Sequence, residues 1–139
     1  MSGERKVKRE EKISTKPLLD KLGVKPFHRI SVIGVGDEDF WAQLIDRAAD
    51  TVKGRLRKDS DLIFFAADSL SELQQLARLK TYLVSNGGIW VVSLKGKSAK
   101  IKDVDVIAAA KTAGLVDNKV VSFSATHTSL RLVIPVSQR

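Results

Sequence analysis

The sequence predicts an α/β fold in three layers, with helices covering both faces of a mostly parallel β-sheet. Short apolar runs alternate along the chain with segments whose apolar residues recur at spacings of three and four. The run at 61–67, DLIFFAA, has no polar residue after Asp61, which is typical of a parallel strand covered on both sides. The last two apolar runs are joined only by residues 125–129, too few for a parallel crossover, so these two strands must be antiparallel. Together these observations predict a Rossmann-like sheet of about six strands that ends in an antiparallel hairpin.

The individual elements follow from local signals. Ser69 and Glu72 form a Ser-x-x-Glu capping box, which predicts a helix start, and the Asn-Gly-Gly at 86–88 is expected to end that helix. Asp103 is expected to cap the last helix, which Gly114 closes. The predicted helices span 17–23, 37–49, 69–85 and 103–113. The predicted strands span 29–34, 51–57, 61–67, 89–94, 119–124 and 130–136.

Length, charge and composition limit the class of protein. The 139 residues suffice for one domain, which we expect over 17–139, behind a charged and disordered tail at 1–16. The formal net charge is +8 and the pI is near 9.9, so the protein is basic and weakly attractive to polyanions. The absence of cysteine excludes a disulfide framework and a thiolate metal site. The sequence shows no secretory signal and no apolar run of about 18 residues, so we expect a cytoplasmic protein.

The stretch RISVIGVGDEDFW, residues 29–41, has the layout of a strand, a tight glycine turn and a helix start. Gly34, Gly36 and Asp37 are therefore candidate ligand-binding residues at the carboxyl edge of the sheet. A dinucleotide fingerprint needs a third glycine where this chain has Asp39, and the three consecutive acids there would repel a diphosphate. Two interpretations stay open. The stretch is either a structural turn before a capped helix, or a site for an adenosine-type ligand such as S-adenosylmethionine or a nucleotide.

Other candidates for a cofactor site follow later strands at the same edge. Asp68 comes directly after the run DLIFFAA, and Lys95 and Lys97 begin a basic loop that extends to residue 102. Lysines can hold a phosphate as point charges, but the Walker spacing is missing. His28 and His127 are the only histidines, and we interpret both as surface or packing residues. With no complete catalytic motif and no predicted metal site, we lean against an enzyme.

The segment 51–57 alternates between apolar and basic residues with a period of two, which predicts a half-exposed strand near the edge of the sheet. Lys53, Arg55 and Arg57 share its basic side and, with the N-terminal tail, are candidates for weak polyanion contact. Basic and aromatic residues do not interleave along the chain, and Trp90 lies in a strongly apolar segment. A nucleic-acid-binding module is therefore the weaker alternative.

Several stretches resemble known families. The stretches LVSNGGIWVVSLKG and AAKTAGLVDNKVVSF resemble a late strand and the following helix–glycine–strand of class I S-adenosylmethionine-dependent methyltransferases. From Pro17 onward, the chain resembles a small bacterial family of domains of unknown function through LLDKLGVKP, RISVIG, DLIFFAADSLSEL, NGGIWVVSLKGKS, GLVDNKV and SLRLV. Members usually carry a tryptophan in the loop before the last strand, where this chain has residues 126–128, THT.

The resemblance implies a Rossmann-like fold that is distantly similar to the C-terminal half of those methyltransferases, and it implies no chemistry. Compared with a full methyltransferase, the chain lacks strand–helix units between residues 50 and 61. Our first functional hypothesis is a non-catalytic domain that acts through binding or self-association. The alternative is an adenosine-type ligand-binding domain or degenerate methyltransferase that uses the carboxyl edge of the sheet.

Overall fold

The computed structural model describes residues 16–139, so the predicted tail lies outside the described residues apart from Lys16. Two short 3₁₀ turns lie at Gly96–Ser98 and Val136–Gln138. The helices are α1 (Leu18–Lys21), α2 (Glu38–Arg47), α3 (Leu70–Leu73), α4 (Leu76–Lys80) and α5 (Asp103–Thr112). The strands are β1 (Ile30–Ile33), β2 (Thr51–Lys53), β3 (Ser60–Ala66), β4 (Leu83–Leu94), β5 (Val116–Ser122) and β6 (His127–Val133).

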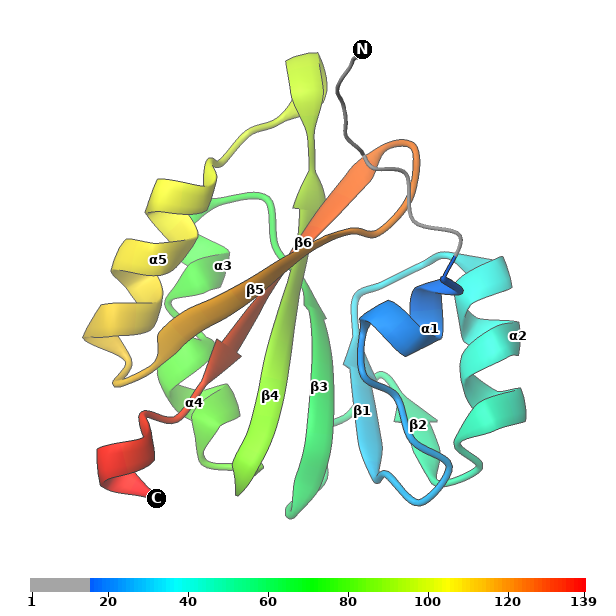
Figure 1. The fold of residues 1–139 in the computed structure, drawn as a ribbon. Coiled ribbons are helices and arrows are strands. Elements are labelled where there is room, and N and C mark those ends of the chain that lie inside the picture. The colour runs from blue at the N-terminus through cyan, green and yellow to red at the C-terminus, as the bar shows by residue number, and fades with distance from the viewer. Residues whose placement is uncertain (1–15) are drawn as a thin grey trace, which may run out of the picture.

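The six strands form one sheet in the order β2-β1-β3-β4-β6-β5 (Figure 1). Strands β2, β1, β3 and β4 are parallel, and β6 pairs antiparallel with both β4 and β5. The mostly parallel, Rossmann-like sheet with an antiparallel hairpin is therefore confirmed. The chain leaves β1 toward β2 on one side and later returns to β3 on the other side. The sheet consequently has its topological switch point between β1 and β3.

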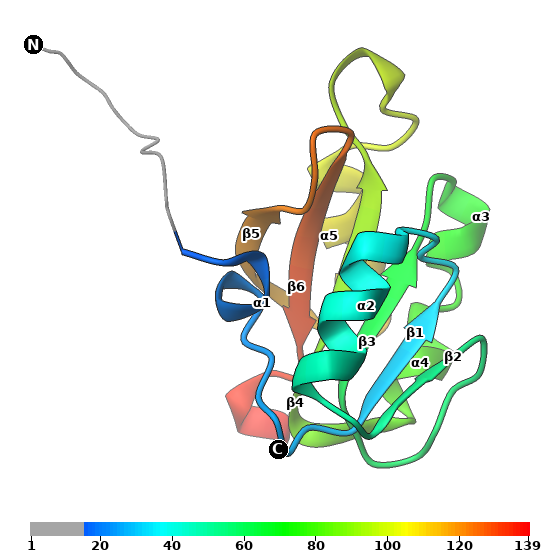
Figure 2. The ribbon, with the colours of Figure 1, turned by 90° about the vertical axis from the view of Figure 1, so that its right-hand side faces the viewer.

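The sheet lies between two layers of helices, and Figure 2 shows α1 and α2 on the opposite side from α3 and α4. Alternate residues of β3 and β4 enter the two hydrophobic cores, as a period-two strand requires. Ile63 and Ile89 face the core beneath α3, α4 and α5. Phe64 and Trp90 face the core beneath α1 and α2. Burial on both faces explains why DLIFFAA reads as a continuous apolar run.

The helix predicted at 69–85 is wrong in its second half. The capping box holds at its start, where Ser69 Oγ accepts from the N–H of Glu72. The helix is divided into α3 and α4, and β4 already begins at Leu83. Gly87 therefore lies within a strand, with no positive φ. A Cβ on Gly87 would lie only 2.6 Å from the carbonyl oxygen of Asp61, so this glycine serves the close approach of strands and does not end a helix.

The edge strand β2 is confirmed at the border of the sheet but is shorter than predicted. It ends at Lys53 because Gly54 adopts a φ of +83° and donates its N–H to the carbonyl of Val32. The residues that follow leave the strand, so Lys53, Arg55 and Arg57 do not share one face of it. The alternation of apolar and basic residues therefore continues in the sequence after Lys53, where the backbone no longer pairs with β1.

The two ends of α5 show one correction and one confirmation. Asp103 is its first residue and not its cap: the capping bond runs from the N–H of Lys102 to Asp105 Oδ2, at 2.8 Å. At the other end Gly114 has a φ of +80°, and the N–H of Leu115 donates to the carbonyl of Ala110 at 2.8 Å. This is the predicted left-handed glycine cap, with Leu115 buried beyond it.

Candidate functional site

A pocket of about 330 Å³ opens at the carboxyl edge of the parallel strands. Its floor comes from the turn after β1, from Ala66 at the end of β3 and from Val92 in β4. The loop between β5 and β6 and the first residue of β6 close the remaining side, with Phe123 and His127. The pocket lies over the switch point between β1 and β3, where open α/β sheets bind their ligands.

The glycine turn after β1 is shaped by two different requirements. Gly34 has a φ of +78°, and a Cβ there would lie 3.4 Å from the Cβ of Ala66. Because of both features, a side chain at Gly34 would strain the backbone and crowd β3. Gly36 has no positive φ, and a Cβ added to it would meet no atom within 4 Å. Gly36 therefore keeps the pocket open without being needed by the backbone.

Asp37 has a structural role and also borders the pocket. Its Oδ1 accepts from the N–H of Phe40 at 2.9 Å, which caps α2 as predicted. The capping bond uses one carboxylate oxygen, and Asp37 is also among the residues that line the pocket. Glu38 and Asp39 are exposed in the first turn of α2. These three acids complement the helix dipole and make this end of the pocket negative.

The apolar part of the pocket lining is formed by Val35, Ala66, Val92 and Phe123. The ring of Phe123 also packs against that of Phe40, with 4.8 Å between their centroids. An apolar wall with a few polar groups at the rim is the usual make-up of a small-molecule site.

His127 lines this pocket, whereas from the sequence we interpreted it as a surface or packing residue. Its ring Nδ1 lies 2.8 Å from Thr126 Oγ1, and its backbone N–H donates to Ser124 Oγ at 3.1 Å. A signal was nevertheless available: β6 is antiparallel, so its first residue must lie at the edge where the parallel strands end. The loop at 123–126 and the first residue of β6 consequently face the glycine turn, and residues 127–128 of the predicted loop belong to β6.

The remaining predicted residues lie at the same edge but do not line the pocket. Asp68 Oδ1 accepts from the N–H of Leu94 at 2.9 Å, so this carboxylate joins the ends of β3 and β4. Lys95 Nζ donates to Ser122 Oγ at 2.7 Å. Lys97 is exposed in the 3₁₀ turn that follows β4. The structure thus brings Gly34, Gly36 and Asp37 together around the pocket, while Asp68, Lys95 and Lys97 lie outside its lining.

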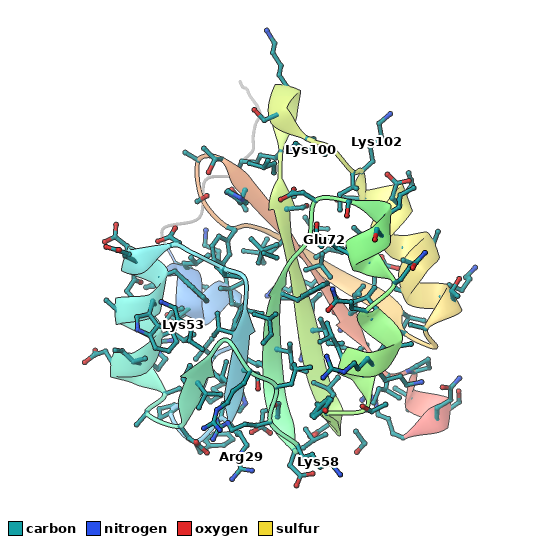
Figure 3. All side chains as sticks on the ribbon, turned by 180° about the vertical axis from the view of Figure 1, so that it is seen from behind. Arg29, Lys53, Lys58, Glu72, Lys100 and Lys102 are labelled. Atoms are coloured by element: carbon teal, nitrogen blue, oxygen red, sulfur yellow. The ribbon has the colours of Figure 1, made fainter. Side chains whose placement is uncertain are left out.

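The basic residues near β2 are largely engaged within the protein. Lys53 Nζ lies 4.9 Å from the centroid of the Trp41 ring. Arg57 Nη1 forms an ion pair with Asp50. Figure 3 shows Lys53 apart from Lys100 and Lys102, which project at the carboxyl edge. Polyanion contact through Lys53, Arg55 and Arg57 stays a prediction, with two of its three cations already partnered.

No group of three histidine, cysteine or acidic side chains within residues 16–139 is arranged to hold a metal ion. No helix in that range is long and apolar enough to cross a membrane.

Known structures share this fold at low sequence identity. LaPhzM matches with a TM-score of 0.66 and 11% identity, over 85% of this chain and 53% of that protein, so the chain spans about half its length. The O-methyltransferase NcsB1 of neocarzinostatin biosynthesis, in complex with S-adenosyl-L-homocysteine, matches with 0.58 and 14%, over 77% and 49%. A TehB-like S-adenosylmethionine-dependent methyltransferase from Corynebacterium glutamicum matches with 0.55 and 14%, over 85% of both chains. These likenesses establish a methyltransferase-like fold.

No curated protein matches the sequence. One family model matches residues 21–136, nearly all of the described chain, and its description is protein of unknown function (DUF3052). The glycine turn, the pocket and helices α2 to α5 fall within the matched range. The chain belongs to the DUF3052 family.

Proposed function

We propose that this protein is a small-molecule-binding domain whose ligand is of the adenosine type and occupies the pocket over the glycine turn. The observation that carries the proposal is the position of the pocket. Gly34 and Gly36 border it at the end of β1, Ala66 borders it at the end of β3, and these ends flank the switch point of the sheet. Its volume of about 330 Å³ is near the lower end of the range for small-ligand sites.

The charges around the pocket favour a ligand without phosphates. The three acids at 37–39 stand at the helix terminus, where a diphosphate would otherwise bind, and they would repel it. S-adenosylmethionine carries a cationic sulfonium and no phosphate. The apolar surface of Phe123 and Val92 suits the flat face of an adenine base. S-adenosylmethionine or S-adenosylhomocysteine is thus the better candidate within the adenosine class.

The comparisons add support of a general kind. NcsB1 and CalO1, both similar in fold, have structures with S-adenosylhomocysteine bound. Identities of 14% and 11% carry the fold and leave the ligand to experiment. We propose binding without catalysis as the simplest function, because the pocket residues are accounted for by shape and capping. We also propose that it acts in the cytoplasm as a single domain over 17–139.

A thermal-shift comparison of S-adenosylmethionine, S-adenosylhomocysteine, adenosine and ATP tests this function. A ligand at a hundred times its dissociation constant adds about 2.7 kcal/mol, which is a shift on the order of 10 °C for a domain of this size. We expect a shift with the first two compounds and a smaller one with ATP, because ATP meets the three acids.

Two variants test whether the thermal shift arises from binding in the pocket over the glycine turn. Gly36→Leu should preserve the fold, since Gly36 has an ordinary φ and open space around it, but should reduce the shift by filling the pocket. Gln43→Leu adds an apolar side chain on the exposed surface of α2 and should keep the shift. A wild-type protein that responds to none of the four compounds, or a Gly36→Leu protein that responds fully, would overturn the proposal.

A further inference from the structure

A second pocket of about 360 Å³ lies at the opposite, amino edge of the sheet. It is formed by the segment between α1 and β1, by the start of β3 and by Gly87 and Arg131 on β4 and β6. In Figure 1 these segments meet at the lower end of the sheet, away from the loop between β5 and β6. The pocket is thus separate from the site over the glycine turn.

Arg131 is the unusual residue of this second pocket. It sits opposite Trp90 in the register of β4 and β6. Its Nε is buried and has no hydrogen-bond partner, and the side chain makes no ion pair within residues 16–139. Burial, together with repulsion from Arg139, lowers the pKa of the Arg131 guanidinium. A partly buried cation without a partner is costly, so an anion would stabilise it.

The backbone beside Arg131 is shaped to receive this guanidinium. A Cβ on Gly88 would lie 2.5 Å from Arg131 Nε and 3.0 Å from Nη2. Any larger residue at Gly88 would therefore displace the guanidinium from its place. Asparagine at 86 and glycine at 87 continue this wall of the pocket. The missing side chain at Gly88 gives the charged group a defined place against β4.

The other charged residues of the pocket favour an anion. Lys25 and His28 line it together with Arg131. His28 Nδ1 accepts from the N–H of Lys25 at 3.1 Å, so a neutral His28 carries its proton on Nε2 and can donate it. Asp61 is the acid among the lining residues, and its Oδ2 already accepts from the N–H of Arg29 at 2.8 Å. Burial is the largest cause that lowers the pKa of His28; Asp61 opposes the shift, and Lys25 and Arg131 reinforce it.

We propose that this amino-edge pocket binds a small ligand through an oxyanion, a phosphate or a carboxylate group, held by the guanidinium of Arg131 and assisted by Lys25 and His28. A guanidinium presents paired N–H donors that match either group. Phe27 is 80% exposed at the rim, with its ring 5.0 Å from that of His28. It offers an apolar surface to the remainder of the ligand. This site is independent of the adenosine-type site, and its ligand has the opposite charge preference.

Titrations followed by amide NMR test the proposal, with phenyl phosphate, benzoate and inorganic phosphate as probes and phenol as the neutral control. We expect saturable shifts at residues 23–28 and 86–88 with the anions and none with phenol. A stronger response to phenyl phosphate or to benzoate identifies which oxyanion the pocket prefers. Arg131→Gln should raise the dissociation constant at least about tenfold, as for the loss of a charge-assisted hydrogen bond.

Two further variants make the result specific. Lys25→Gln removes an exposed charge with little effect on the fold and should weaken binding about threefold, in line with a solvent-screened contact. Lys100→Gln removes the same charge at the carboxyl edge (Figure 3) and should leave binding unchanged. Equal affinity in wild type and Arg131→Gln would overturn the proposal, as would shifts confined to residues 95–102. A single-stranded oligonucleotide, added as a further probe, would also overturn the proposal if it bound at residues 23–28 in preference to the small anions. The site would then be a nucleic-acid-binding surface.

Discussion

The indole Nε1–H of Trp90 donates a buried hydrogen bond of 3.1 Å to the backbone carbonyl of Leu22. It joins the end of α1 to the middle of β4, 68 residues apart in the chain. Both side chains are almost fully buried, at 0% and 1% exposure. The bond thereby fixes the start of the segment that carries Lys25 and His28 to the amino-edge pocket.

Trp90→Phe tests this anchor. Phenylalanine keeps much of the apolar area but leaves the carbonyl of Leu22 without its donor. We expect a loss of about 1–3 kcal/mol in the free energy of unfolding, from the unsatisfied buried acceptor and the smaller ring. Urea denaturation measures this loss. An unchanged midpoint would show that this hydrogen bond contributes nothing net to stability.

Two substitutions at Asp37 separate the contribution of its capping hydrogen bond to stability from that of its charge. Asp37→Ala removes the acceptor for the N–H of Phe40 and should cost about 1 kcal/mol of stability. Asp37→Asn keeps a good capping side chain and should cost much less, although it removes the charge beside the pocket. Thermal unfolding of both variants gives the comparison. Equal losses in the two would mean that the charge of Asp37 matters more than its hydrogen bond.

Asp50, next to the edge strand β2, is expected to make the stability of the protein sensitive to acid. Its carboxylate contacts Arg57 and Arg29, and the hydrogen bond from Arg57 is the main cause that lowers the pKa of Asp50 below 3.8. Burial opposes this shift. A lowered pKa means that the folded state favours the ionised carboxylate. The stabilisation is therefore complete above the unfolded-state pKa and is lost as the pH falls through the folded-state pKa.

Asp50→Asn should consequently lower the urea midpoint at pH 7, and the difference from wild type should disappear as the pH falls well below 3.8. The effect is expected to be small, because Asp50 is exposed and solvent screens its ion pairs. Urea midpoints measured at pH 7 and in strong acid check both expectations. A difference that stays constant across this range would assign the loss to something other than the charge of Asp50.

Gly87 and Gly36 form a matched pair. Gly87→Ala would place its Cβ 2.6 Å from the carbonyl of Asp61 and 2.9 Å from Leu83 Cδ1, so we expect a loss of about 1–3 kcal/mol from overpacking. Gly36→Ala meets no atom within 4 Å and should be neutral or stabilising by up to about 1 kcal/mol, because it reduces the freedom of the unfolded chain. Denaturant midpoints of the two variants should differ in sign or clearly in size.

Most of the fold could be predicted because its signals are local. The continuous apolar run in β3, the capped start of α2 and the short link between the last two strands each follow from neighbouring residues. The error at 69–85 arose where local signals conflict. Leu83 continues the helical spacing, yet its backbone pairs with Ser60 of β3. A partner that is 23 residues away along the chain decides such a case, and its position cannot be read from a local pattern.

The sequence by itself determined the layered sheet, the capped helices and the candidate turn formed by Gly34, Gly36 and Asp37, because covalent proximity places those residues together. Only the tertiary structure decided what faces them. It brought His127 into the pocket through the reversed direction of β6, and it turned Asp68 and Lys95 to contacts outside the pocket. It also left Arg131 Nε, beside Gly88, without a hydrogen-bond partner among residues 16–139. These contacts depend on the pairing of strands that are distant in the sequence, and a local periodicity does not predict them.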